Sequence, residues 1–251
     1  MRKHIYIIIG FLFISTLTFA QKSTITFQSE DGILITADLY LAHEESAPFI
    51  LLCHQAGWSR GEYLEIAPKL NTLGFNCMAI DQRSGGEVNG IINQTKLEAE
   101  KAQKETLYHH AIPDIMAALK YVNKNYPQSS ALIQWGSSYS SALSLKLGGD
   151  HPDLIDGILA FAPGEYYERY GLGADYITKS AKNITQAVFI TSAKIEYSKW
   201  KDIYASIPSS KKAYFLPDTK GKHGSSALWE KCEDSPAYWE AVEKFLEQFT
   251  Q

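Results

Sequence analysis

Short apolar runs alternate with amphipathic segments along most of the chain. Two alternating, β-branched runs come first, at residues 24–28 and 33–41, and the turn residues Glu30-Asp31-Gly32 between them predict an antiparallel hairpin. Continuous apolar runs follow, which predict strands covered on both faces, as in a parallel sheet. These runs are residues 49–53, 75–80, 131–135, 155–161, 187–191 and 212–216.

Segments with helical periodicity separate the predicted strands. In residues 106–125, apolar side chains recur at spacings of three and four, which predicts a stripe that packs on a sheet. The other segments of this kind are residues 63–73, 138–147 and 233–249. Because strands and helices alternate without an internal repeat or a linker, we expect a three-layer α/β fold. It would have a mostly parallel sheet and an N-terminal antiparallel hairpin, in a single domain over residues 21–251.

The first residues have the layout of a secretory signal peptide. Two basic residues precede the apolar run 5–12, and the segment ends in the small residue Ala20. The alternative, a transmembrane anchor, fits poorly because the apolar run is short and is followed by serine and threonine. We therefore expect residues 1–20 to be cleaved, which leaves an exported protein, periplasmic or secreted, with no stable membrane anchor.

The composition narrows the classes of function. The chain is 45% hydrophobic and carries a net charge of −4 without a basic cluster, so nucleic acid is not an expected partner. No glycine-rich phosphate loop and no metal-ligand spacing are present, so we expect neither a cofactor nor a metal ion. Of the three cysteines, Cys53 and Cys77 fall in apolar runs and are expected to be buried thiols, with a bridge between them left open.

The most informative stretch is Gly136-Ser137-Ser138-Tyr139-Ser140, where a predicted strand runs directly into a helix. A serine can act as a nucleophile when a sharp strand-to-helix turn lifts its hydroxyl out of the sheet. Small residues two positions before and after it make room for that turn, and here they are Gly136 and Ser140. The alternative is that Ser138 only caps the N-terminus of the helix.

This stretch resembles the Gly-x-Ser-x-Gly elbow of the α/β hydrolases, in particular the branches of dienelactone-hydrolase-like proteins and small esterases, and departs only at its last position. The resemblance implies that Ser138 is the nucleophile. It also implies an oxyanion hole made of backbone N–H groups. One would come from Tyr139, and the other from Ala56 or Gln55 in the loop at residues 54–58.

Two further segments match the family in the expected order. The turn that contains Asp81 and Arg83 is similar to the family's Asp-x-Arg-Gly turn, and we expect both residues to be structural. In the family, the catalytic histidine follows the last strand and precedes a glycine, which implies that His223 is the general base. His54, in the predicted oxyanion loop, is the rival histidine near the site.

The third member of a Ser-His-acid triad is the least well defined. It must hydrogen-bond the imidazole and hold its tautomer. The family carries it after the strand that is here residues 187–191, where the available carboxylate is Glu196, one position later than the usual aspartate. Glu165, which follows the preceding strand, is the second choice. Asp218 and Asp202 are further alternatives.

These residues indicate a serine hydrolase that cleaves a carboxylic ester or a related acyl bond of a small molecule through a covalent acyl-enzyme. Trp58, Tyr166 and Tyr167 are expected to line the substrate pocket, although aromatic residues in such loops can equally pack on the core. Two alternatives remain: a peptidase-like acyl hydrolase, and a non-catalytic ligand-binding protein on a hydrolase scaffold.

Overall fold

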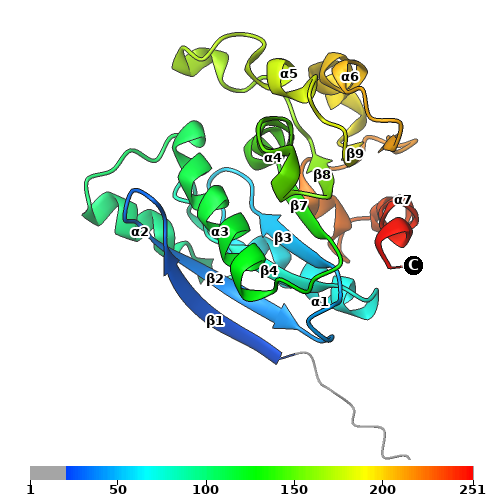
Figure 1. Ribbon diagram of the computed structural model, residues 1–251. Helices are drawn as coiled ribbons and strands as arrows, with labels where there is room; N and C mark the ends of the chain where they lie inside the picture. Colours follow the sequence, from blue (N-terminus) through cyan, green and yellow to red (C-terminus); the bar gives the residue numbers. More distant parts are fainter. Residues whose placement is uncertain (1–20, 251) are drawn as a thin grey trace, which may run out of the picture.

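An eight-stranded sheet forms the centre of the protein in the computed structural model, which describes residues 21–250 (Figure 1). The predicted signal peptide lies outside the described residues. The strands of this sheet are β1 (Gln21–Gln28), β2 (Leu34–Leu41), β3 (Phe49–Cys53), β4 (Asn76–Ile80), β7 (Leu132–Ser137), β8 (Gly157–Phe161), β9 (Ala187–Thr191) and β10 (Lys212–Phe215). Their spatial order is β1-β2-β4-β3-β7-β8-β9-β10.

The sheet has the predicted mixture of strand directions. β1 and β2 form the antiparallel hairpin, β2 is also antiparallel to β4, and every other neighbouring pair is parallel. β3, β4, β7, β8 and β9 are buried along their whole length, so the continuous apolar runs correctly predicted strands covered on both faces. The prediction is wrong for β10, the edge strand, in which Tyr214 is 50% exposed because no further strand flanks it.

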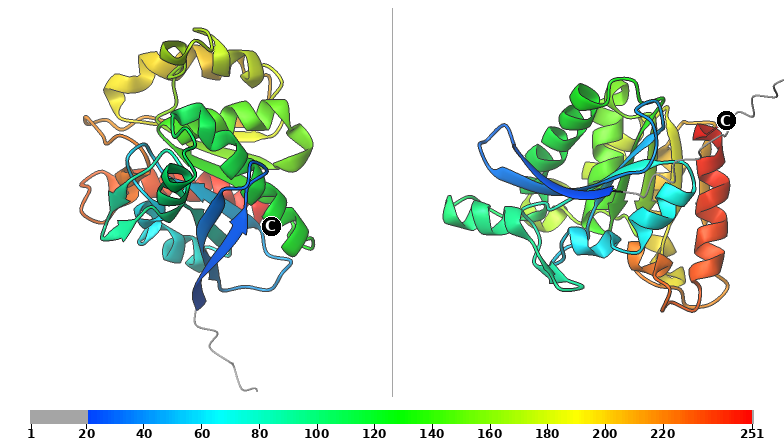
Figure 2. Two further views of the ribbon diagram at one scale, coloured as in Figure 1. Left: turned by 90° about the vertical axis from the view of Figure 1, so that its left-hand side faces the viewer. Right: turned by 90° about the horizontal axis from the view of Figure 1, so that it is seen from below.

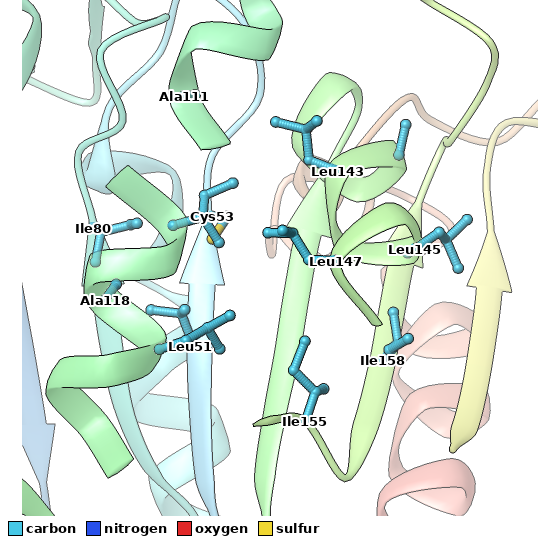
Figure 3. Packing of buried hydrophobic residues seen from close by; sticks show 14 of the residues in the cluster. Leu51, Cys53, Ile80, Ala111, Ala118, Leu143, Leu145, Leu147, Ile155 and Ile158 are labelled. Atoms are coloured by element: carbon cyan, nitrogen blue, oxygen red, sulfur yellow. The ribbon is translucent and has the colours of Figure 1, made fainter. Parts of the chain in front are cut away.

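Helices cover both faces of the sheet and give the fold three layers (Figure 2). The helices are α1 (Ile66–Thr72), α2 (Gln94–Lys101), α3 (Ile112–Asn125), α4 (Tyr139–Asp150), α5 (Tyr176–Ala181), α6 (Tyr197–Ser206) and α7 (Ser235–Leu246). α2 to α6 contribute to the hydrophobic cluster on one face, and α1 and α7 contribute to the cluster on the other. Figure 3 shows part of the first cluster, where Leu51 of β3 lies beside Ala118 of α3.

Several small elements were not predicted from the sequence. α5 and α6 follow β8 and β9, and a two-stranded sheet of β5 (Glu87–Val88) and β6 (Ile91–Ile92) lies between β4 and α2. Cys53 and Cys77 are both buried and free, so no disulfide joins them. Among the helices of residues 21–250, none has the length and apolar character needed to cross a bilayer.

A buried ion-pair network joins three elements on the α3 side of the sheet. Arg83, 3% exposed, donates to both carboxylate oxygens of Asp31 at 2.7 and 2.8 Å and to Asp114 on α3 at 2.5–3.0 Å. The backbone N–H of Arg83 also donates to Asp114. Asp114 is fully buried, whereas Asp31 is 31% exposed. The predicted structural role of Arg83 is therefore to tie the hairpin turn and the turn after β4 to α3.

We expect Asp114→Ala to lower the free energy of unfolding by about 3–5 kcal/mol, because it leaves a buried guanidinium with only half of its partners. Asp31→Ala is the matched control. It removes the more exposed carboxylate of the same network, so its cost should be about 1 kcal/mol. Urea denaturation of the two variants and the parent measures both values. Equal losses of unfolding free energy in the two variants would show that the burial of Asp114 does not increase the cost of its removal.

Candidate active site

Ser138 lies at the carboxyl end of β7 in a strained backbone conformation. Its φ is 58° and its ψ is −120°, a region that L-residues rarely adopt. The backbone N–H of Ser138 donates to the carbonyl of Phe161 at 2.7 Å, which holds the turn against β8. The hydroxyl makes no capping hydrogen bond to α4, so the N-cap alternative is wrong. Ser138 is therefore presented on a sharp strand-to-helix turn, as the motif predicts.

The two small residues around Ser138 have different structural roles. A Cβ atom on Gly136 would lie 2.4 Å from the Cα of Ser141 and 2.5 Å from the carbonyl carbon of Ser140, so only glycine fits there. The fully buried hydroxyl of Ser140 accepts the N–H of Ser137 at 2.8 Å and lies 2.8 Å from the carbonyl of Cys53. A serine in place of the family's glycine thus ties the elbow to the end of β3.

His223 and Glu196 are in direct contact. The Nδ1 atom of His223 lies 2.7 Å from Oε1 of Glu196, and the ring is 39% exposed. Partial burial raises the pKa of Glu196, but the hydrogen bond to His223 and the charges of His223 and Lys199 outweigh it, so the net pKa lies below the usual value. A carboxylate at Nδ1 fixes the tautomer in which the other nitrogen, Nε2, is free to accept a proton.

The loops that carry these two residues are linked to each other. The N–H of Lys194 donates to the carbonyl of Lys220 at 2.9 Å. The buried Tyr238 of α7 donates its hydroxyl to the carbonyl of Ser192 at 3.0 Å and accepts the N–H of Lys222 at 3.3 Å. The tyrosine thus bridges the loop after β9 and the loop after β10, which sets the distance between Glu196 and His223.

Within the described residues, no hydrogen bond joins His223 to Ser138, but the loop that carries His223 contacts the elbow around Ser138. The N–H of Ser225 donates to the hydroxyl of Ser137 at 2.9 Å, so the histidine loop lies against the elbow. Tyr166 contacts the same region. Burial and the charge of Glu196 raise the pKa of Tyr166, whose hydroxyl donates to the carbonyl of Ala162 at 2.6 Å. Catalytic hydrogen bonds are often long without substrate, so this geometry is compatible with a Ser-His pair.

The other candidate acids do not contact His223. Glu165 accepts hydrogen bonds from the backbone N–H groups of Ile177 and Thr178 at 2.9 and 2.8 Å, and from the Thr178 hydroxyl at 2.7 Å. It therefore caps the N-terminus of α5. Asp218 and Asp202 are exposed. Of the four carboxylates considered from the sequence, only Glu196 lies against the imidazole.

The rival histidine is held in a fixed, neutral state. His54 is fully buried, its Nδ1 lies 2.8 Å from the carbonyl of Gln55, and its Nε2 accepts the N–H of Gln82 and the amide of Asn93, both at 3.0 Å. Burial lowers the pKa of His54 to about 4. Both ring nitrogens are occupied, so His54 supports the loop and has no free nitrogen for proton transfer.

The structure distinguishes the predicted oxyanion donors. The N–H of Gln55 donates to Oε2 of Glu62 at 2.8 Å, so Gln55 is not a free oxyanion donor. Within residues 21–250, no acceptor occupies the N–H of Ala56 or the N–H of Tyr139. These two groups remain available as a pair of donors.

A cavity of about 360 Å³ opens above Ser138. Its walls are Tyr108, Ser138, Glu165, Tyr166, Glu168 and Arg169. Tyr166 thus lies where the sequence predicts it, while Tyr108 and Arg169 were missed because nothing in the pattern connects residue 108 to the loop after β8. The guanidinium of Arg169 lies 4.7 Å from the centre of the Tyr108 ring.

Two predicted pocket residues lie elsewhere. Tyr167 is fully buried and donates its hydroxyl to the carbonyl of Tyr139 at 2.7 Å, so it supports the elbow from within the core. Trp58 stacks on Trp229, with ring centres 5.2 Å apart, and is not part of the cavity wall. For these two aromatic residues the packing alternative is the correct one. Across the described part of the chain, no three His, Cys, Asp or Glu side chains are grouped as metal ligands.

The profile of the serine aminopeptidase family S33, a family of α/β hydrolases, matches residues 44–216. This match covers more than half of the chain and includes both Ser138 and Glu196. The chain belongs to this α/β-hydrolase family. No curated protein matches its sequence.

Solved structures show the same hydrolase fold at low sequence identity. An esterase of Pyrococcus furiosus superposes with a TM-score of 0.71 and 16% identity, over 97% of this chain and 98% of the esterase. The dienelactone hydrolase of Anabaena variabilis gives a TM-score of 0.70 and 11% identity, over 92% of this chain and 99% of the other. The acylaminoacyl peptidase of Pyrococcus horikoshii gives 0.66 and 14%, over 94% of this chain but only 42% of the peptidase.

Family membership and fold together identify the protein as a hydrolase, with acyl compounds as the general class of substrate. In this hydrolase, the candidate site lies where α/β sheets usually bind ligands, outside the carboxyl ends of the strands. β7, β9 and β10 supply the loops that carry Ser138, Glu196 and His223. The three side chains come from segments that are far apart in the sequence and adjacent, or nearly so, in the sheet.

Proposed function

We propose that the protein is an exported serine hydrolase that cleaves carboxylic esters or related acyl bonds of small molecules through a Ser138-His223-Glu196 triad. The observation that carries the proposal is the 2.7 Å contact between His223 Nδ1 and Glu196 Oε1, in a loop held against a strained serine elbow. An imidazole oriented by a carboxylate beside a raised serine is the arrangement that activates a hydroxyl nucleophile.

In the proposed reaction, Nε2 of His223 removes the proton of the Ser138 hydroxyl while Oγ attacks the carbonyl carbon. The carbonyl oxygen becomes an oxyanion that accepts hydrogen bonds from the N–H groups of Ala56 and Tyr139. The tetrahedral intermediate collapses, His223 gives its proton to the leaving alkoxide, and an acyl-Ser138 ester remains. Water then attacks this ester with His223 again as base, which releases the acid and restores the serine.

Hydrolysis of an aminoacyl bond is the second candidate function. The observation that favours it is the family match, since the matching profile is described as a serine aminopeptidase. The esterase and the dienelactone hydrolase that share the fold over nearly their whole length favour small esters. Both candidates use the same nucleophile and differ in the leaving group.

Export is part of the proposal and depends on residues 1–20. Their basic start, apolar centre and terminal Ala20 support recognition by a secretion pathway. N-terminal sequencing of the protein recovered outside the cytoplasm tests this, and a first residue other than Gln21 would contradict cleavage after Ala20.

A direct test treats the purified protein with two substrates and one covalent probe. We expect a short-chain p-nitrophenyl ester to be hydrolysed faster than an aminoacyl p-nitroanilide, and a fluorophosphonate to label Ser138, as mapped on the digested protein. Turnover of the anilide alone, with the label on Ser138, would favour the peptidase. If the folded protein binds an ester analogue but shows neither label nor turnover, it is a non-catalytic ligand-binding protein on a hydrolase scaffold.

A further inference from the structure

A carboxyl group that the proposed reaction does not use lies directly behind the elbow. Glu62 belongs to the short 3₁₀ helix Arg60–Tyr63, which precedes α1, and its side chain is fully buried. Its backbone carbonyl accepts the indole N–H of Trp229 at 2.9 Å, and its own N–H donates to the carbonyl of Ser59 at 3.0 Å. The main chain is thus fixed on both sides, and the carboxylate points between two loops of the site.

One oxygen of Glu62 connects to the histidine loop. Oε1 accepts the hydroxyl of Ser137 at 2.7 Å, and Ser137 in turn accepts the N–H of Ser225 at 2.9 Å. The approach is close: a Cβ atom on Gly224, which has a φ of 68°, would lie 2.6 Å from the Ser137 hydroxyl. Through this chain of two hydrogen bonds, Glu62 holds the residue before the nucleophile and the residues that follow His223.

The other oxygen connects to the oxyanion loop. Oε2 accepts the N–H of Gln55 at 2.8 Å, and the next N–H along the chain is that of Ala56, one of the two free donors of the site. Fixing one peptide plane restricts the direction of the next, because the peptide bond is planar and only φ and ψ of residue 55 can vary between them. Glu62 thereby orients the Ala56 donor without touching the substrate.

This carboxyl group lacks a compensating cation. Within residues 21–250, no lysine, arginine or histidine forms an ion pair with Glu62. Complete burial raises its pKa to about 7, while the hydrogen bonds from the Ser137 hydroxyl and the Gln55 N–H oppose the rise. Burial of an unpaired carboxyl costs stability, so packing alone does not account for this choice of residue.

We propose that Glu62 is a positioning residue of the hydrolase, which holds the oxyanion loop and the histidine loop in register around Ser138 with its two carboxylate oxygens. The proposal rests on the proposed function for its kinetic consequence. The hydrogen-bonded arrangement itself is a separate claim, which can be measured in a protein without activity.

The first test is Glu62→Gln. The amide keeps the shape of the side chain but offers only one accepting oxygen, so it cannot serve both Ser137 and the N–H of Gln55. A displaced oxyanion donor lowers the rate of acyl transfer, and we expect kcat for the ester to fall by about 10–100-fold with KM within about twofold. The thermal midpoint at neutral pH should change little, because the lost hydrogen bond is offset by the removal of a buried charge. A purely structural role would instead lower the midpoint and leave kcat unchanged.

Glu65→Gln is the matched control, with the same chemical change three residues along the same segment. Glu65 is exposed and accepts only the backbone N–H of Glu230 at 2.9 Å, so kcat should stay within about twofold of the parent. Unchanged kcat in Glu62→Gln, or an equal fall in Glu65→Gln, would overturn the proposal.

Amide hydrogen exchange separates this proposal from the proposed function. In Glu62→Gln, the N–H groups of Gln55 and Ser225 should exchange at least about tenfold faster, while the amides of the central strands keep the parent rate. If the parent protein hydrolyses no ester but the two amides respond, the proposed function fails and the connection through Glu62 stands. If the exchange of both amides is unchanged, Glu62 does not hold the two loops.

Discussion

Ser138→Ala is expected to lower kcat/KM for a short-chain p-nitrophenyl ester by about 10³-fold or more, and to abolish labelling by a fluorophosphonate. Without the hydroxyl, no acyl-enzyme can form, and the remaining catalysis depends on the oxyanion donors and on binding alone. The variant should fold normally, because the hydroxyl makes no capping hydrogen bond to α4. Initial-rate kinetics on the parent and the variant, at equal protein concentration, measure the effect.

Ser144→Ala is the matched control for this experiment. Its hydroxyl lies on the same helix and donates only to the carbonyl of Ser140 at 2.9 Å, so the activity should stay close to that of the parent. Loss of activity in both variants would point to a disturbed helix. A fluorophosphonate adduct on the Ser138→Ala protein would place the nucleophile elsewhere.

Glu196→Gln should also have a large effect, a fall in kcat of about 10³–10⁴-fold. The amide can no longer stabilise the imidazolium that forms on His223, and it can hold the ring in the wrong tautomer. The pKa of Glu196 lies below its usual value in the folded protein, so the carboxylate stays ionised to a lower pH than that of a free glutamate. The acid limb of the activity profile should therefore report on other groups.

Glu165→Gln tests the alternative acid by the same change. Glu165 accepts the first amides of α5, and an amide in its place loses one of these contacts. The expected cost is about 1 kcal/mol of stability, as for a lost helix cap, with little change in kcat. If kcat instead falls with Glu165→Gln and survives Glu196→Gln, the acid of the triad is Glu165.

The hydrophobic pattern was sufficient to predict the central strands of the sheet. It was not sufficient to predict the elements near the edge of the sheet. β3, β4, β7, β8 and β9 are buried on both faces, and such strands have apolar residues at almost every position. α6 was not predicted because only Trp200 and Ile203 of its ten residues are buried, so its apolar stripe is too narrow to recognise. β10 contains apolar residues yet lies at the edge, and its position depends on strand order, which the local pattern does not contain.

The candidate site, too, was predicted only where it depends on local sequence, and not where it depends on contacts between distant segments. The elbow around Ser138 is local: a glycine two positions earlier and a strand before it were visible in the sequence. The choice between Glu196 and Glu165 depends on the course of two loops, and each carboxylate finds its partner only in the folded chain. Glu62 was missed because its partner Ser137 is 75 residues away and its position, just before α1, is one where an exposed acid is common.

The backbone at Ser138 has a consequence for how this sequence could change over time. A non-glycine residue held at a φ of 58° costs about 1–3 kcal/mol, and glycine would relieve most of it. A sequence optimised for stability alone on this backbone would therefore place glycine at position 138 and would lose the hydroxyl. Selection for the chemistry of the hydroxyl therefore explains why position 138 carries a serine, although glycine would be more stable there.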